Sequence, residues 1–230
     1  MESKGSILIK LMLLLQYLSV LCVSQNFDFF FFVQQWPGSA CNTQQGCCYP
    51  TTGKPPADFA ISGLFPSNND GSYPYNCDTN NPFQQSQISD LRSNLQSNWP
   101  SLLCPSSDGS YTWSAAWDIF GTCSESVLNQ HDYFAAALNL KEQTNLLRAL
   151  ATGVILSNGG SYALDVTKEV IKNSVGYTPF IECNVDSSGN SQLYQIYLCV
   201  DISGSYLVDC PVVPKNVVEC GSTFLYPSFY

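Results

Sequence analysis

The sequence has little positive charge and almost no histidine. It contains 9 Lys and Arg against 18 Asp and Glu, and a single His, for a formal net charge of −9. Proteins that bind nucleic acid without sequence preference use Lys and Arg to replace the counterions around phosphates. The basic residues here are few and do not cluster. The composition therefore argues against a general polyanion binder, although the field at one site can differ from the net charge.

Several motifs are also absent. The chain has no internal repeat, no run of like charges and no Asn-x-Ser/Thr acceptor site for glycosylation. A single His and the lack of paired CxxC motifs disfavour the usual zinc ligand sets. We therefore expect no metal and no cofactor.

Beyond the N-terminus, no apolar run is long enough to span a membrane. Lys4 and Lys10 precede or enter an apolar run that reaches Val23 and is followed by a small residue. A charged start, an apolar stretch and a small-residue cleavage site indicate a signal peptide. A membrane anchor is the alternative, which the short and interrupted run disfavours. We expect a signal peptide over residues 1–24 and one domain over residues 25–230.

Cysteine is plentiful, with 11 residues in the full sequence, one of them in the predicted signal peptide. Ten remain in the mature chain. An even number in a secreted protein indicates up to five disulfides. The spacing alone does not determine the pairing.

The hydrophobic patterns predict strands at both ends of the chain and helices in the middle. Predicted strands cover residues 27–35, 59–64, 192–201 and 206–210. Predicted helices cover residues 86–99, 126–156 and 165–172. A hairpin turn is predicted at residues 187–190. This order is typical of an α+β fold with an antiparallel sheet.

Three passages resemble signatures of the T2 ribonucleases, especially the plant S-like group. They are residues 31–37 followed by Cys41, residues 59–66, and residues 113–123. The C-terminal half resembles the same group, so the resemblance covers essentially the whole mature chain. It implies an RNase T2 fold, in which several helices pack on a central antiparallel sheet. It also implies five disulfides, which are Cys41–Cys47, Cys48–Cys104, Cys77–Cys123, Cys183–Cys220 and Cys199–Cys210.

The T2 reaction needs acid–base groups. The ribose 2′ oxygen attacks the adjacent phosphorus, so one group takes a proton and another gives one, and two imidazoles suit this task. A carboxylate and a Lys stabilise the charge that builds on the phosphate. The resemblance places the first His at Ser62. It places the second motif's His, Glu, Lys and His at Ala115, Ala116, Ile119 and Phe120.

All five of these positions are therefore degenerate in this sequence. Each acid–base group typically contributes about 10²–10⁴ in rate, and no substitute is visible near either motif. We therefore expect that the protein is not an enzyme. The only His, His131, lies outside both motifs and is expected on a helix surface. A nucleophilic pair of Ser62 and His131 is an alternative, but no GxSxG turn surrounds Ser62.

Only some residues of the family's base-binding pocket are present in this sequence. Gln35 matches the Gln that holds a base in the family, and Leu103 matches an apolar wall position. Ser101 stands where plant members can carry Asn, and Thr112 where they carry an aromatic residue. We therefore expect that Gln35 is retained only for packing. Weak residual nucleotide binding is the alternative.

Amide side chains are abundant. Beyond residue 24 the chain has 17 Asn and 13 Gln, 30 in total among 230 − 24 = 206 residues. Some plant members of the family accumulate as inactive storage proteins. The sequence therefore predicts a catalytically inactive vegetative nitrogen store, either extracellular or vacuolar. The alternative is a pseudoenzyme that retains weak nucleotide or partner binding in the old cleft. Neither role needs an obligate nucleic acid or a membrane, and the sequence does not indicate an oligomeric state.

Overall fold

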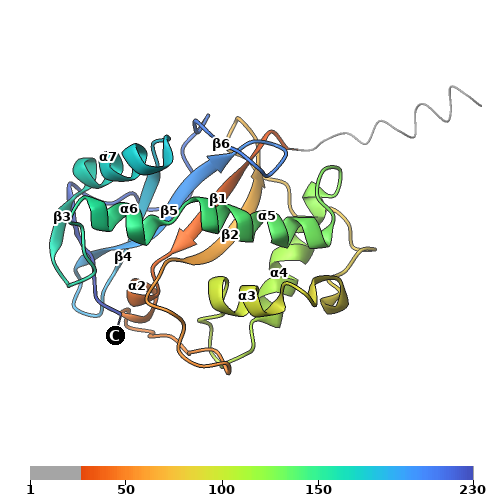
Figure 1. Ribbon diagram of the computed structural model, residues 1–230, viewed down its shortest axis with the longest axis horizontal. Coiled ribbons are helices and arrows are strands. Elements are labelled where there is room, and N and C mark those ends of the chain that lie inside the picture. The colour runs from red at the N-terminus through yellow and green to blue at the C-terminus, as the bar shows by residue number, and fades with distance from the viewer. Residues whose placement is uncertain (1–26, 230) are drawn as a thin grey trace, which may run out of the picture.

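The computed structural model describes residues 27–229. The predicted signal peptide, residues 1–24, lies outside the described residues. Figure 1 shows a central sheet that runs through the molecule with helices lying against it. The predicted α+β fold class is confirmed.

The sheet is built around β1, which pairs antiparallel with β2 on one side and with β5 on the other. Strand β5 also pairs antiparallel with β4 and β6, and parallel with β7 through one register position. Strand β7 pairs antiparallel with β3. The strands are β1 (Phe29–Gln35), β2 (Ala60–Ser67), β3 (Ser161–Ala163), β4 (Phe180–Val185), β5 (Ser191–Val200), β6 (Leu207–Val208) and β7 (Thr223–Leu225).

The first five residues of β1 are apolar because both faces of the strand are covered there. Side chains alternate between faces along a strand. Phe30 and Phe32 enter the main hydrophobic core, whereas Phe29, Phe31 and Val33 join a smaller cluster on the opposite face. This double burial explains why the segment has a continuous apolar run instead of a polar and apolar alternation.

The helices pack mainly on the face that carries Phe30 and Phe32. In Figure 1 the helix α5 lies along the sheet, and α3 and α4 lie at one end of it. Helix α4 contributes the buried Trp113 and Trp117 to this core. The helices are α2 (Pro37–Cys41), α3 (Arg92–Asn98), α4 (Ser110–Ile119), α5 (Gln130–Gln143), α6 (Leu146–Thr152) and α7 (Leu164–Val175), with 3₁₀ turns at Gln85–Ile88 and Gly121–Ser124.

Two predicted helices are interrupted. The segment 126–156 forms α5 and α6, because Thr144 leaves helical geometry and the Asn145 side chain caps the next helix by accepting the Arg148 N–H at 2.9 Å. The segment 86–99 forms a 3₁₀ turn followed by the short α3. In both segments the spacing of apolar residues predicted the buried face of the helix, but it did not predict where the helix is interrupted.

Other element boundaries shift by a few residues. Strand β2 runs three residues past the predicted end at Leu64, and β6 is limited to two residues. Five disulfides link the same cysteines that the resemblance pairs: Cys41–Cys47, Cys48–Cys104, Cys77–Cys123, Cys183–Cys220 and Cys199–Cys210. Within residues 27–229 no helix is long and apolar enough to cross a membrane.

Candidate functional site

The face of the sheet opposite α5 carries a row of polar side chains. Glu182 on β4 lies opposite Gln195 on β5, and Gln195 lies opposite Gln35 on β1. On β2, Ser62 is the extra residue of a β-bulge beside the step from Val33 to Gln34 in β1. Bulges re-aim a side chain, and this one brings Ser62 to the row. We call Ser62, Gln35, Gln195, Tyr197 and Glu182 the polar row.

Hydrogen bonds connect most of the polar row. Gln195 Nε2 donates to Ser62 Oγ at 3.0 Å. Tyr197 Oη lies 2.8 Å from Gln195 Oε1 and 2.6 Å from Glu182 Oε2. A phenol has one proton, so it cannot donate to both of these oxygens at once.

Two proton arrangements satisfy every contact in the row. A protonated Glu182 can donate to Tyr197, which then donates to Gln195. Alternatively, Glu182 is ionised and accepts from Tyr197, and the Gln195 amide is reversed so that its NH₂ group donates to Tyr197. Amide orientation is assigned from such networks and is not seen directly. In the reversed arrangement Ser62 donates to Gln195, so the charge of Glu182 sets the direction of the Ser62 hydroxyl.

The environment favours proton uptake by Glu182. Burial raises the pKa of this carboxyl group above its ordinary value, and the hydrogen bonds from Tyr197 and from the Val218 backbone only partly oppose this. Burial and the neighbouring Glu182 raise the pKa of the Tyr197 phenol, so Tyr197 stays neutral. Glu182 is therefore the titrating group of the row.

The second family motif lies on α4. Trp113 and Trp117 face the core, and the positions where the resemblance implies catalytic groups are occupied by apolar side chains. Ala116 packs against the main core, Ile119 is 37% exposed, and Phe120 ends the helix. None of these side chains, nor Ala115, can exchange a proton.

The carboxylate within this motif serves the local structure. Asp118 Oδ1 accepts the Phe83 backbone N–H at 2.8 Å, and its Oδ2 accepts the Ser114 hydroxyl at 2.9 Å. Both oxygens are thus held by α4 and by the segment that precedes the first 3₁₀ turn. Asp118 therefore does not replace the missing carboxylate.

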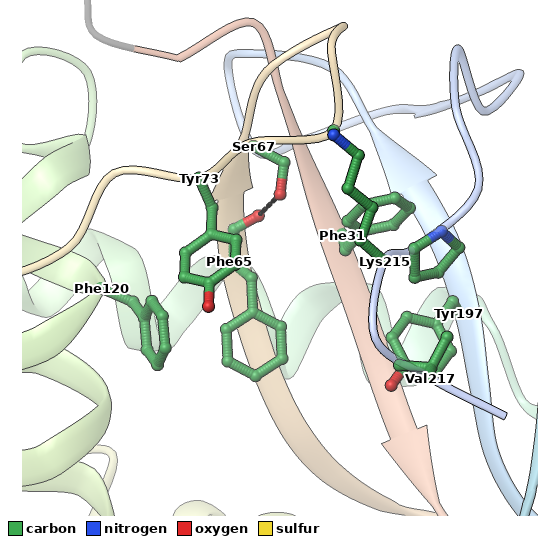
Figure 2. A pocket seen from close by; sticks show the side chains of 10 residues that line it. Phe31, Phe65, Ser67, Tyr73, Phe120, Tyr197, Lys215 and Val217 are labelled. Atoms are coloured by element: carbon green, nitrogen blue, oxygen red, sulfur yellow. Dashed lines mark hydrogen bonds between the residues drawn. The ribbon is translucent and has the colours of Figure 1, made fainter.

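Next to the polar row lies an aromatic pocket of about 190 Å³. Figure 2 shows the Phe65 and Phe120 rings on one side of it and Phe31 and Tyr197 on the other. Phe65 and Phe120 meet edge to face, with ring centroids 4.8 Å apart. Side chains that surround the pocket include Phe31, Phe65, Tyr73, Phe120, Tyr197 and Lys215.

The single histidine is engaged elsewhere. His131, in the first turn of α5, lies with Nε2 3.0 Å from Asp90 Oδ2 and Nδ1 3.5 Å from Asp132 Oδ1. The hydrogen bond that His131 donates to the Asp90 carboxylate is the main cause that raises the pKa of His131. Ser62 is bonded to Gln195 instead. The structure therefore does not pair Ser62 with His131.

The two predicted base-binding residues differ in setting. Gln35 is half-buried in the polar row. Leu103 is 61% exposed, on the loop between α3 and α4 next to Cys104. Ser101 is buried in the same loop. Gln35 thus belongs to the site described above, whereas Leu103 presents its side chain to solvent.

Sequence reasoning missed three of the residues that define this region. Glu182, Tyr197 and Lys215 lie far from both family motifs in sequence. Side chains alternate between the two faces of a strand, so Gln195 and Tyr197 lie on the same face of β5. The sequence alone could have predicted this. Their meeting with Glu182 depends on the register between β4 and β5, and this register has a bulge between Glu182 and Cys183.

The sequence profile of the Ribonuclease T2 family matches residues 27–210. The chain belongs to the ribonuclease T2 family. Extracellular ribonuclease LE from Solanum lycopersicum is 57% identical over 99% of each chain. The crystal structure of RNase NT in complex with 5′-AMP superposes with a TM-score of 0.86 at 50% identity, covering 89% of this chain and 100% of that one. A ribonuclease-like storage protein from Panax ginseng is 30% identical, covering 77% of this chain and 72% of that protein.

These comparisons correct one expectation. From the residues at positions 62, 115, 116, 119 and 120, the sequence predicted that this T2 protein is not an enzyme. That prediction is wrong in the light of the comparisons, because relatives at 50 to 57% identity are named ribonucleases and point to an enzyme. The prediction rested only on the residues of the two motifs.

Proposed function

We propose that this T2 protein binds RNA-derived nucleotides on the open face of its sheet, with Gln35, Gln195 and Ser62 as contacts. The observation that carries the proposal is the polar row, where two amides and a hydroxyl lie side by side on the face opposite the main core. Amides both donate and accept hydrogen bonds, so they can match the edge of a base. RNase NT, which is similar over its whole length, was crystallised with 5′-AMP.

Titration of the protein with 5′-AMP, 5′-GMP and 5′-UMP tests this proposal. We expect dissociation constants on the order of 1 mM, since few charged groups contribute. Gln35→Ala and Gln195→Leu should each weaken binding about fivefold, which corresponds to one lost hydrogen bond of about 1 kcal/mol. Gln87→Ala, an exposed Gln beside α3, is the matched control. No heat and no NMR shift at 10 mM nucleotide would reject the proposal.

An assay of RNA cleavage between pH 4 and pH 8 belongs to the same experiment, because the named relatives are ribonucleases. Any cleavage must use groups other than imidazoles at positions 62, 115 and 120. Glu182 is the carboxyl group of the polar row, and burial raises its pKa above the ordinary value. Loss of cleavage in Glu182→Gln, with nucleotide binding retained, would assign the reaction to this face.

Nitrogen storage is a second candidate, favoured by the amide content. The mature chain, residues 25–230 as one domain, has 30 Asn and Gln in total. The similar protein from Panax ginseng is named a storage protein. We place the protein in the secretory route, extracellular or vacuolar, on the basis of the signal-peptide pattern and the disulfides. Protein levels measured through dormancy and regrowth test this role, and levels that stay low and flat would reject it.

A further inference from the structure

We infer that a pocket on the helical side of the sheet binds a neutral sugar through its hydroxyl groups. The pocket lies between α3, the end of α5 and the segment before β2. We call it the amide pocket, because four asparagines line it together with one ion pair: Asn94, Asn98, Asn139, Asn145, Lys141 and Asp58. Helix α5 covers the face of the sheet opposite the polar row, so this site is separate from the contacts proposed for nucleotides.

A buried lysine with unused donors lines the amide pocket. Lys141 is only 6% exposed, and its Nζ donates to Asp58 Oδ2 at 2.9 Å. An ammonium group has three N–H bonds, and within residues 27–229 no other group accepts from this one. A buried donor without a partner costs free energy. The two remaining N–H bonds therefore favour a ligand whose oxygens accept them.

The amides around this lysine also have hydrogen-bonding groups to spare. Among the described residues, the side chains of Asn94 and Asn139 make no hydrogen bond. Asn98 Nδ2 donates to the Asn94 backbone oxygen at 3.0 Å, which leaves the side-chain oxygen of Asn98 open. Asn145 Oδ1 accepts the Arg148 N–H at 2.9 Å, which leaves the NH₂ group of Asn145 open. The pocket thus offers both donors and acceptors.

The charges of the amide pocket favour a neutral ligand. Asp58 balances the charge of Lys141, and Glu142 adds a second carboxylate to the lining. An anion would meet both carboxylates, and a cation would meet the ammonium group. A hydroxyl group both donates and accepts. A neutral ligand with several hydroxyl groups therefore matches this set of donors and acceptors.

The size and the lining of the pocket suit one sugar ring. Its volume is about 320 Å³. A cavity of roughly 150 Å³ holds benzene, and a hexose has twice as many non-hydrogen atoms. Leu138 supplies an apolar surface, but no aromatic ring is among the lining residues in the described part of the chain. Because ring stacking is missing, we expect weak affinity.

A second pocket adjoins the amide pocket and shares Glu142 and Asn145 with it. Its volume is about 560 Å³, and its other polar lining side chains include Arg148, Thr152 and Asn173 on α6 and α7. Two adjoining polar pockets can hold consecutive units of a sugar chain. A short oligosaccharide could thus supply the ring as well as a free sugar does.

The test uses D-glucose, cyclohexanol and glucose 6-phosphate, each titrated into the full mature protein and followed by NMR. We expect glucose to shift the side-chain resonances of Asn94, Asn139 and Asn145, with a dissociation constant on the order of 1 mM. Cyclohexanol keeps a six-membered ring but has a single hydroxyl group, so it should shift none of them at the same concentration. Glucose 6-phosphate should bind no more tightly than glucose.

Variants of the pocket should weaken glucose binding. Asn94→Ala and Asn139→Ala should each weaken it about fivefold, as expected for one lost hydrogen bond. Lys141→Met removes both open N–H donors and should weaken it about tenfold, with an unfolding curve to check that the variant folds. Asn80→Ala is the matched control, since Asn80 is exposed, makes no side-chain hydrogen bond among the described residues and lies outside the pocket. It should leave glucose binding unchanged.

Three results would overturn the inference. The first is that glucose shifts no resonance of the amide pocket at about 50 mM. The second is that Asn80→Ala weakens glucose as much as Asn139→Ala does, or that cyclohexanol binds as well as glucose. The third is that glucose 6-phosphate binds more than about fivefold tighter than glucose and loses this advantage in Lys141→Met, because the pocket would then be an anion site.

Titration with cellotriose identifies the source of the sugar. Tighter binding than glucose, with shifts at Arg148 and Asn173, would assign the pocket to a sugar chain, whereas equal affinity would assign it to a free sugar. Either result supports the inference. Displacement of glucose by 5′-AMP would overturn it, since the two sites lie on opposite faces of the sheet. Failure of 5′-AMP to shift Gln35 and Gln195 resonances would reject only the nucleotide proposal.

Discussion

Replacing Tyr197 with Phe should destabilise the protein more at high pH than at low pH. Above the pKa of Glu182, its carboxylate accepts the Tyr197 hydroxyl at 2.6 Å. A hydrogen bond to a charged group contributes about 1.5–3 kcal/mol and a neutral one about 0.5–1.5 kcal/mol. We therefore expect Tyr197→Phe to lower the free energy of unfolding by about 2 kcal/mol at pH 8 and about 1 kcal/mol at pH 4.

The sign follows from linkage. The pKa of Glu182 is higher in the folded state than in the unfolded state. In the pH window between these two pKa values the folded state binds more protons, so the stability of the protein falls as pH rises. Tyr197 opposes this by favouring the carboxylate, so its loss raises the pKa further and widens the window. Two other charged residues lie near Glu182. Glu219 forms an isolated antiparallel backbone bridge with Glu182, and Lys168 Nζ donates to Glu219 Oε1 at 2.6 Å. These two residues are unchanged by the substitution.

Urea unfolding at pH 4 and pH 8 measures the effect. With a slope of about 2 kcal/mol per molar urea, the midpoint should fall by about 1 M at pH 8 and about 0.5 M at pH 4. Tyr206→Phe, at an exposed Tyr, should change the midpoint little at either pH. In a Glu182→Gln background the pH dependence of the Tyr197→Phe effect should vanish. Equal losses at both pH values, or a pH dependence that persists without Glu182, would refute the reasoning.

Substitutions at three other places test how the fold is held together. The buried Lys141 pairs with Asp58 at 2.9 Å, so Asp58→Asn should cost about 3–5 kcal/mol by leaving a buried charge, whereas Lys141→Met should cost far less; equal Tm losses would contradict this. Replacing both Cys183 and Cys220 by Ser opens a loop with a sequence separation of 37 and should cost about 4 kcal/mol in chemical unfolding. Asn129→Ala removes the side-chain cap of α5 and should lower the unfolding free energy by about 1 kcal/mol, and no change would argue against the cap.

The sequence predicted the parts of the fold that depend on local patterns. The apolar run around Phe31 became β1, and the segment 165–172 lies inside α7. The sequence prediction missed the break at Thr144. There the Thr144 hydroxyl donates to the Leu140 backbone oxygen and accepts the Gln34 side-chain N–H at 2.8 Å. That contact joins residues 110 positions apart, which no local window contains.

The candidate site was harder to predict for the same reason. The two motifs contain Ser62 and Phe120, but they said nothing of Glu182 or Lys215. Those residues reach the site through strand pairing in the C-terminal half and through the turn that holds Lys215 on Asp70. The whole molecule sets the pairing register of the strands and the placement of the loops. The motifs therefore predict the site residues that lie within them and miss those that lie far from them in sequence.

The separation between core and open face has an evolutionary consequence. Trp113 and Trp117 face inward from α4, while Ile119 and Phe120 lie at its outer end and Ser62 lies on a bulge. Substitutions at the outer positions change what the surface can bind without disturbing the packing that most of the folding energy depends on. A lineage built on this scaffold can therefore exchange one surface chemistry for another in single steps, each through a protein that still folds.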